Sequence, residues 1–221
     1  MPESLGLVTL RDPESPASEA YRTLRMNLKF ASLDTEIRSL LVASPAAGEG
    51  KSTTLANLAV TMAQVEQKII VVDCDLRKPH LHELFGVSND VGLTTMMLDD
   101  SALSEPPLLA TPVEGLRVLP SGPLPPRPAD LLGSKRMEHI LESLLGMCDV
   151  VLLDAPPITA VTDAAILATK VHGVLVVLAA GSTKRESAQL AVERLNKVNA
   201  NIIGAVLNNA PLDASLRGYY A

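Results

Sequence analysis

The sequence predicts an α/β protein with a doubly wound, mainly parallel sheet that carries helices on both faces. Uninterrupted apolar runs, such as SLLVA at 39–43 and IIVV at 69–72, are typical of strands buried on both sides. Helical patterns alternate with these runs, as repeated β–α units require. A glycine-bearing loop, residues 44–53, joins the first run to a helical pattern, which places a phosphate-binding loop at the start of the sheet.

The elements are expected in a regular order along the chain. The first helix is expected from about Glu19 to Phe30, with Ser18 as its N-cap. Strands are expected near residues 39–43, 69–73, 116–119, 150–153, 173–179 and 202–207. Helices are expected near residues 51–65, 80–85, 134–145, 163–170 and 184–198. The proline-rich segment Gly122–Pro128 is expected to form a stiff loop.

Length and composition indicate a single folded domain. The chain has 221 residues, of which 47% are hydrophobic, enough for one sizeable core. Only 2% are aromatic and tryptophan is absent, so the core must consist of aliphatic side chains. We expect a flexible leader over residues 1–17, the domain over 18–211 and a tail over 212–221.

Charge and hydropathy exclude several classes of function. A net charge of −6 argues against a nucleic-acid partner, which would favour a basic face. The polar, acidic N-terminus does not resemble a signal peptide, and the apolar stretch near 171–181 is too short to span a bilayer. Cys74 and Cys148 adjoin expected core strands, so we interpret them as buried free thiols of a cytosolic protein.

The loop after the first strand has the residues that hold nucleotide phosphates. In such loops backbone N–H groups converge on anionic oxygens, and the following helix points its positive end toward them. Lys51 is expected to reach the phosphates and the Ser52 hydroxyl to bind Mg²⁺. The first glycine of the usual pattern is replaced by Pro45, and the alternative is an ordinary turn that caps a helix. The expected nucleotide-binding residues of the loop are Ala47, Gly48, Glu49, Gly50, Lys51, Ser52 and Thr53.

Three carboxylates follow two of the expected strands. Asp73 and Asp75 end one apolar run, and Asp154 ends another. Ligands of open parallel sheets bind at the carboxyl ends of the strands, so these groups should meet at the edge that carries the loop. Because clustered carboxylates repel one another, a shared cation such as Mg²⁺ bound to a nucleotide is expected there. Each aspartate taken alone is explained about as well by a helix cap.

Several segments together resemble the bacterial protein-tyrosine kinases of capsular and exopolysaccharide synthesis. The resemblance covers residues 18 to 220, nearly the whole chain, and includes three nucleotide motifs in the family's order. The segments are EAYRTLRMNLKF (19–30), SPAAGEGKSTT (44–54), VVDCDLRKP (71–79), HELFGVSNDVGL (82–93), SGPLPPRPADLLGSKRM (121–137) and VVLLDAPPITAVTDA (150–164). The resemblance implies a P-loop nucleoside triphosphatase of the deviant Walker class, with residues 18–211 as its tyrosine-kinase domain.

The resemblance assigns roles to the matching residues, with ATP and Mg²⁺ as cofactors. Lys51 would be catalytic, and Ser52, Asp75 and Asp154 would hold the metal. Asp73 would orient the acceptor tyrosine hydroxyl and take its proton. Reference pKa values of about 3.9 for aspartate and 10 for tyrosine make full prior deprotonation cost ~8 kcal/mol, so we expect Asp73 mainly to position the hydroxyl. Asn208 matches a position that contacts adenine, and a simple polar strand end is the alternative.

The resemblance also implies an assembly and its acceptor sites. Glu19, Arg22 and Arg25 match an E-x-x-R-x-x-R stripe that joins subunits into a ring, although Glu19 and Arg22 could simply form an intrahelical pair. Tyr219 and Tyr220 match the C-terminal acceptor tyrosines, phosphorylated between neighbouring subunits. Two tyrosines are fewer than the family usually carries, and a coincidental tail is the alternative.

The implied function is autophosphorylation that regulates polysaccharide synthesis and export. The implied partners are further copies of this chain, a transmembrane polysaccharide co-polymerase adaptor and a cognate tyrosine phosphatase. The implied location is cytoplasmic, at the inner face of the plasma membrane, through the adaptor. Three alternative functions remain. One is a partitioning or septum-positioning ATPase, but those proteins carry a signature lysine where this chain has Ala46. The others are a non-catalytic ATP-binding assembly factor and a metal-cluster carrier, which would need a paired CxxC.

Overall fold

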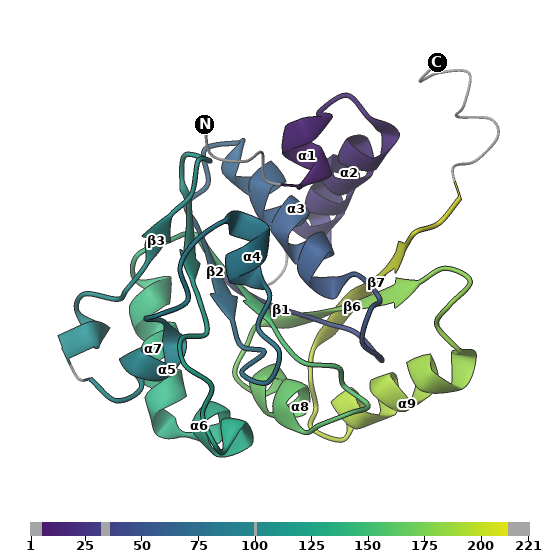
Figure 1. The fold of residues 1–221 in the computed structure, drawn as a ribbon. Coiled ribbons are helices and arrows are strands. Elements are labelled where there is room, and N and C mark those ends of the chain that lie inside the picture. Colours follow the sequence, from purple (N-terminus) through teal and green to yellow (C-terminus); the bar gives the residue numbers. More distant parts are fainter. Residues whose placement is uncertain (1–5, 32–35, 100, 212–221) are drawn as a thin grey trace.

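The strands form one twisted sheet that runs through the centre of the molecule (Figure 1). The computed structural model describes residues 6–31, 36–99 and 101–211. Within these residues the sheet has seven strands in the order β3-β4-β2-β5-β1-β6-β7. The strands are β1 (Ser39–Ala43), β2 (Ile69–Asp73), β3 (Leu109–Ala110), β4 (Leu116–Leu119), β5 (Val150–Asp154), β6 (Gly173–Ala179) and β7 (Ile202–Asn208). Every pairing is parallel except that of β3 with β4, so the predicted mainly parallel sheet is confirmed.

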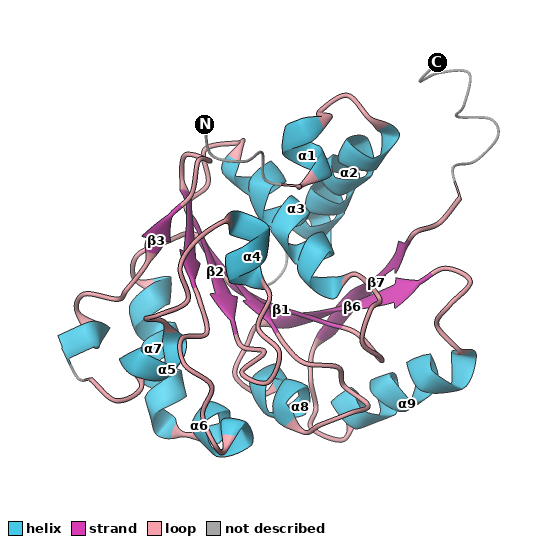
Figure 2. Ribbon diagram, in the orientation of Figure 1, coloured by secondary structure: helices cyan, strands magenta, loops and turns pink. Residues whose placement is uncertain are grey.

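Helices cover both faces of this sheet (Figure 2). One face carries α1 (Val8–Arg11), α2 (Pro16–Ala31), α3 (Lys51–Ala63) and α4 (Leu81–Phe85). The other carries α5 (Leu93–Met96), α6 (Pro128–Gly133), α7 (Lys135–Leu145), α8 (Asp163–Ala168) and α9 (Arg185–Asn196), and a 3-10 turn, η1 (Ser101–Leu103), precedes β3. The doubly wound architecture is thereby confirmed.

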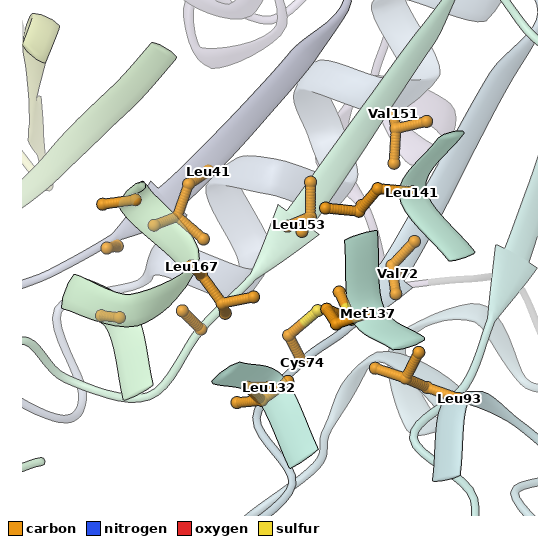
Figure 3. Packing of buried hydrophobic residues seen from close by; sticks show 14 of the residues in the cluster. Leu41, Val72, Cys74, Leu93, Leu132, Met137, Leu141, Val151, Leu153 and Leu167 are labelled. Carbon is orange, nitrogen blue, oxygen red and sulfur yellow. The ribbon is translucent and has the colours of Figure 1, made fainter. Parts of the chain in front are cut away.

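Two aliphatic layers form the core, one on each side of the sheet. Alternate strand residues point to opposite faces, so Leu40 packs toward α3 whereas Leu41 packs toward the opposite helices. Figure 3 shows the second layer, where Leu153 of β5 lies close to Leu141 of α7 and Cys74 lies near Met137. The core is aliphatic, as the low aromatic content predicts.

Helix α2 starts earlier than predicted. It begins at Pro16, and Ser15 rather than Ser18 caps it, because the Ser15 hydroxyl accepts a hydrogen bond from the Ser18 N–H at 3.3 Å. The expectation that Ser18 is the N-cap is therefore wrong. Its hydroxyl instead donates to the Asp12 carbonyl at 2.7 Å and fastens the preceding turn to the helix.

The expected flexible leader does not describe residues 7–16. Helix α1 lies in this segment, and Leu7 is only 1% exposed in the layer that packs on α3. The buried Thr9 donates two hydrogen bonds to Asn57 Oδ1, from its N–H at 3.1 Å and from its hydroxyl at 2.9 Å. These contacts join the beginning of the chain to the helix that follows the phosphate loop.

Some short elements were missed by the sequence analysis, although α4 and α8 were predicted. Helices α5 and α6 and strand β3 have six residues or fewer, too short to produce a periodic pattern. Helix α6 begins at Pro128, where the expected stiff loop ends, because proline suits the first turn of a helix. The tail with Tyr219 and Tyr220 lies outside the described residues. Among the described residues, no helix combines the length and apolar character needed to cross a bilayer.

Candidate nucleotide site

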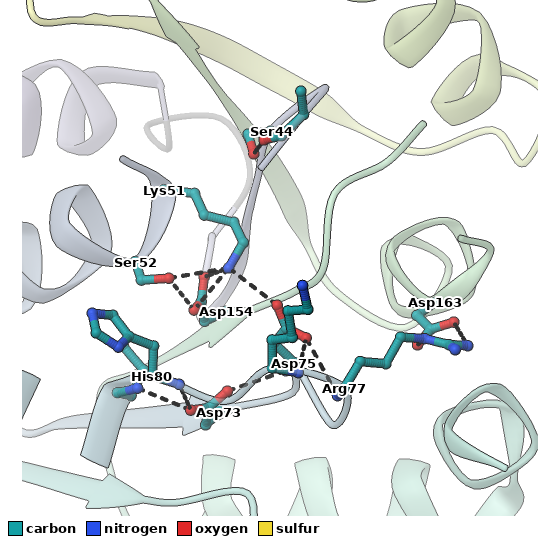
Figure 4. Close-up of polar contacts among 12 residues, drawn as sticks. Ser44, Lys51, Ser52, Asp73, Asp75, Arg77, His80, Asp154 and Asp163 are labelled. Carbon is teal, nitrogen blue, oxygen red and sulfur yellow. Dashed lines mark hydrogen bonds and ion pairs between the residues drawn. The ribbon is translucent and has the colours of Figure 1, made fainter. Parts of the chain in front are cut away.

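The three central strands bring the phosphate loop and the carboxylates together. Strand β5 lies between β2 and β1, and the register places Asp154 beside both Asp73 and Val42. The loop that follows β1 therefore begins next to the carboxylates that end β2 and β5. Figure 4 shows these side chains converging at the carboxyl edge of the sheet. The predicted meeting of loop and aspartates is confirmed.

The loop has the backbone shape that phosphate binding needs. Gly48 and Gly50 have positive φ values of 79° and 84°, a conformation that side chains strongly disfavour. Helix α3 begins at Lys51 with no side-chain cap, so a side chain does not block the N–H groups of its first turn. Pro45 is compatible with this shape, and its carbonyl accepts a hydrogen bond from the Thr159 hydroxyl at 2.7 Å.

The Lys51 ammonium lies among the acidic groups of the site. Its Nζ is 3.0 Å from both carboxylate oxygens of Asp154, 3.0 Å from the Ser52 hydroxyl and 3.6 Å from Asp75 Oδ2. The Ser52 hydroxyl donates to Asp154 Oδ2 at 2.5 Å. The Lys51 ammonium, the Ser52 hydroxyl and the carboxylates of Asp75 and Asp154 thus form one polar cluster (Figure 4).

These side chains suit a magnesium ion that takes its remaining ligands from water and from the nucleotide. No group of three or more His, Cys, Asp or Glu side chains within the described residues is arranged to hold a metal by itself. Mg²⁺ usually takes one or two carboxylates and fills the other positions with water and phosphate oxygens. Asp75, Asp154 and the Ser52 hydroxyl provide ligands of this kind beside the phosphate loop.

Asp73 is held by backbone hydrogen bonds rather than by side chains. It is fully buried, and its Oδ2 accepts the backbone N–H groups of His80 and Leu81 at 3.0 Å, while Oδ1 accepts the Asp75 N–H at 3.1 Å. Burial, and then the charge of Asp154, raise the pKa of Asp73 to about 7. Asp73 therefore fixes the turn into α4 and combines this with a pKa close to neutrality.

Asp154 is fully buried, like Asp73, but it contacts side chains of the phosphate loop. Burial raises its pKa, whereas Lys51 and the Ser52 hydroxyl oppose that rise because they favour the ionised form. Its backbone also contributes, since the Asp154 carbonyl accepts the Cys74 N–H at 2.9 Å and continues the pairing of β5 with β2.

An ion pair that the sequence analysis did not predict joins two walls of the site. The Arg77 guanidinium donates to both carboxylate oxygens of Asp163, at 2.9 and 3.0 Å. Asp163 is fully buried at the start of α8, and Arg77 follows Asp75 by two residues. In the sequence, the only signal for Arg77 is its position two residues after Asp75. The separation of Arg77 and Asp163 along the chain gives no indication that they pair.

An open cavity of about 530 Å³ lies beside these groups. Its lining residues come from the loop, from the segment after β2 and from the segment after β5. They are Ala47, Gly48, Gly50, Lys51, Ser52, Thr53, Asp75, Arg77, Lys78, His80, Pro156, Pro157, Ala160 and Val161. Most of the predicted loop residues therefore line one cavity.

Comparisons with known proteins place the chain in a family. Residues 37–215 match the family described as ParA: NUBPL iron-transfer P-loop NTPase. The tyrosine-protein kinase YwqD of Bacillus subtilis (strain 168) is 42% identical over 216 residues, which are 97% of this chain and 91% of that protein. The chain belongs to the bacterial tyrosine-protein kinases, within the P-loop NTPases.

Solved structures agree with the family assignment. The kinase domain of the Escherichia coli tyrosine kinase ETK is 34% identical, with a TM-score of 0.88 over 95% of this chain and 82% of that one. The septum site-determining protein MinD from Pyrococcus horikoshii OT3, solved with Mg-ADP, is 21% identical with a TM-score of 0.66, which shows a common fold alone. The P-loop NTPase fold of this tyrosine-kinase family member implies nucleotide binding.

Two predicted nucleotide-binding residues of this tyrosine-kinase family member do not line the cavity. The Glu49 side chain is buried and accepts hydrogen bonds from the Ala46 N–H and the Thr183 hydroxyl. Asn208, at the end of β7, donates from Nδ2 to the Glu49 carbonyl at 3.1 Å. The hydrogen bonds of both residues lie within the loop or between the loop and neighbouring segments. The sequence analysis did not identify Thr183 as a contact of the loop.

The predicted oligomerisation stripe is engaged within the subunit. Arg22 pairs with Glu19 at 2.7 Å, which is the intrahelical alternative considered above. Arg25 donates to the Thr61 carbonyl of α3 at 2.7 Å. Because Glu19 and Arg22 remain partly exposed, a role of this stripe between subunits stays a prediction.

Proposed function

We propose that this protein is an ATP-dependent protein-tyrosine kinase that transfers the γ-phosphoryl group to tyrosines of neighbouring subunits. The observation that carries the proposal is the convergence of Lys51, Ser52, Asp75 and Asp154 beside the phosphate loop. The 42% identity to a tyrosine-protein kinase over nearly the full length of both chains supports the same activity.

Each group at the site has a task in phosphoryl transfer. When bound, Mg²⁺ would supply positive charge to offset the negative charge of the nucleotide phosphates. Ser52, Asp75 and Asp154 are the residues that would hold it. The Lys51 ammonium pairs with Asp154 and lines the cavity, so it would stabilise negative charge on phosphates bound there.

Asp73 is suited to receive a proton late in the transfer. Its pKa of about 7 narrows the gap to a tyrosine hydroxyl from about six units to about three, which corresponds to ~4 kcal/mol. The backbone N–H groups of His80 and Leu81 hold the carboxylate at the turn before α4. We assign Asp73 the positioning of that hydroxyl and the acceptance of its proton.

The proposal extends to the acceptor, the assembly and the partners. Tyr219 and Tyr220 are the acceptor tyrosines, and Glu19, Arg22 and Arg25 join subunits into a ring. The protein acts at the inner face of the plasma membrane, where a transmembrane polysaccharide co-polymerase adaptor recruits it and a tyrosine phosphatase resets it. Its phosphorylation state regulates the synthesis and export of capsular or extracellular polysaccharide.

One assay tests the enzymatic activity. The purified protein is incubated with labelled ATP and Mg²⁺, and the phosphate is mapped by mass spectrometry. We expect label on Tyr219 or Tyr220, abolished in Lys51→Met and retained in Lys68→Met, which removes an exposed lysine at the far end of β2. Hydrolysis of ATP without any phosphotyrosine would contradict the proposal and favour an ATPase of the same fold.

A second assay tests the ring. Light scattering of the unaltered protein with nucleotide should give a higher oligomer, and the double variant Arg22→Ala/Arg25→Ala should dissociate it. Glu138→Ala, which removes a half-exposed carboxylate that pairs with Lys170 on the opposite face, is the control. A monomer under all nucleotide conditions would remove the ring from the proposal.

A further inference from the structure

A buried carboxylate lies inside the loop that is shaped for anions. Glu49 is only 4% exposed, and its neighbours Gly48 and Gly50 line the nucleotide cavity. A negative charge at this position repels phosphate groups, so it weakens binding unless it brings a compensating benefit. The contacts of the side chain indicate what that benefit is.

The Glu49 carboxylate connects the loop to the end of strand β6. Its Oε2 accepts the Ala46 N–H at 2.9 Å, which closes the loop on itself. Its Oε1 accepts the Thr183 hydroxyl at 2.6 Å, and Thr183 Oγ1 in turn accepts the Ala179 N–H at 2.7 Å. A continuous chain of hydrogen bonds thus runs from Ala179, the last residue of β6, to the start of the loop.

A second connection reaches the same residue from strand β7. Asn208 Nδ2 donates to the Glu49 carbonyl at 3.1 Å. The contact is close, because a Cβ added at Gly50 would lie 2.0 Å from Asn208 Nδ2. The side chain and the backbone of Glu49 are therefore both fixed by the two strands beyond β1.

We propose that Glu49 is a positioning residue, and that its hydrogen bonds to Ala46 and Thr183 hold the phosphate loop in its binding shape. A loop that is already ordered loses less entropy when the phosphates bind, so the hydrogen bonds outweigh the repulsion from one buried charge. The inference rests on the proposed function only in taking a nucleotide as the ligand. It does not depend on phosphoryl transfer.

Two substitutions separate the hydrogen bonds from the charge. Glu49→Ala removes both. Glu49→Gln removes the charge but keeps hydrogen bonding, since its oxygen can accept the Ala46 N–H while its amide donates to Thr183 Oγ1. On the other side, Thr183→Val removes the hydroxyl and Thr183→Ser keeps it.

The test is the affinity for MgADP, measured by titration calorimetry on the full chain and corrected for the folded fraction. We expect Glu49→Ala and Thr183→Val each to bind more than fivefold more weakly, and Glu49→Gln and Thr183→Ser to remain closer to the unaltered protein. The double variant Glu49→Ala/Thr183→Val should be no more than twofold weaker than the weaker single variant, because one connection is lost in each case. Glu105→Ala, an exposed carboxylate near η1, controls for the loss of one charge.

The outcomes decide the proposal without the kinase assay. A loss of fivefold or less in Glu49→Ala, or a loss in Glu49→Gln as large as that in Glu49→Ala, would overturn it. Additive losses in the double variant would overturn it as well. Should Glu49→Ala fail to fold, the comparison of Thr183→Val with Thr183→Ser decides by the same threshold. MgADP binding in a protein that forms no phosphotyrosine would remove the proposed function and leave this inference standing.

Discussion

The pairing of Arg77 with Asp163 gives a prediction about stability. The change is Arg77→Ala, which removes the guanidinium from a carboxylate that is fully buried. Both oxygens of Asp163 then lose their donor, because Arg77 bonds to each of them. The segment after β2 and the start of α8 also lose the ion pair that joins them beside the nucleotide cavity.

The magnitude follows from the exposure of the two partners. Breaking a fully buried pair costs about 3–5 kcal/mol, whereas exposed pairs contribute about 0–1 kcal/mol. Arg77 is 39% exposed and Asp163 is 0% exposed, so the pair lies between these limits. We expect a loss of about 2–3 kcal/mol in the free energy of unfolding. For a chain of this size that loss lowers Tm by about 4–12 °C.

Denaturant and thermal unfolding, followed by circular dichroism, measure the effect. The matched control is Arg127→Ala, because Arg127 and Asp130 form a pair at 3.7 Å in which both side chains are at least 70% exposed. The control should lose no more than about 0.5 kcal/mol. Asp163→Asn should lose less than Arg77→Ala, since it removes the buried charge along with the ion pair.

A result in which Arg77→Ala is as mild as Arg127→Ala would refute this reasoning. It would mean that water reaches Asp163 once the guanidinium is removed, so that the carboxylate is not enclosed by the protein. An equally large loss in Asp163→Asn would show that the geometry of the pair, rather than the buried charge, stabilises the fold.

Three further predictions concern the site and the beginning of the chain. The pKa of Asp73 is about 7 in the folded state and 3.8 ordinarily, so between these pH values the folded state holds a proton that the unfolded state has lost. The free energy of unfolding therefore falls as pH rises toward 7. Unfolding titrations from pH 4 to 8 should therefore show a shallower decline in Asp73→Asn, and an unchanged slope would contradict this. Gly50→Ala places a Cβ 2.0 Å from Asn208 Nδ2 at a φ of +84° and should abolish MgADP binding in calorimetry, whereas Gly204→Ala, with open space around it, should bind normally. Asn57→Ala leaves two buried Thr9 donors without their acceptor and should cost about 2–3 kcal/mol in urea unfolding; a loss below 0.5 kcal/mol would show that α1 is not held by these bonds.

The sequence predicts the sheet and most of the site because both depend on local patterns. Buried strands such as β5 give unbroken apolar runs, and the aspartate that ends each run must lie at the same edge. Lys51 and Ser52 belong to a loop of fixed spacing, so their place follows from the chain alone. The structure brings these residues together as predicted.

Contacts between distant segments could not be predicted in this way. Glu49 was expected to face the nucleotide with the rest of its loop, yet its hydrogen-bond partner Thr183 lies 134 residues away. Thr9 and Asn57, separated by 48 residues, are held together by tertiary packing that turns a seemingly loose leader into a helix. Such partners are determined by the folded arrangement and carry no spacing in the sequence.

The two cysteines provide a built-in reporter of local opening. Cys74, which lies between Asp73 and Asp75, is fully buried, and burial raises the pKa of its thiol; the pKa of the Cys148 thiol is raised to about 11. Because the thiolate is the reactive form, a thiol-selective dye should label the native protein only when the chain opens around these side chains. The rate of Cys74 labelling would then measure how often the core between Asp73 and Asp75 opens, without an introduced cysteine.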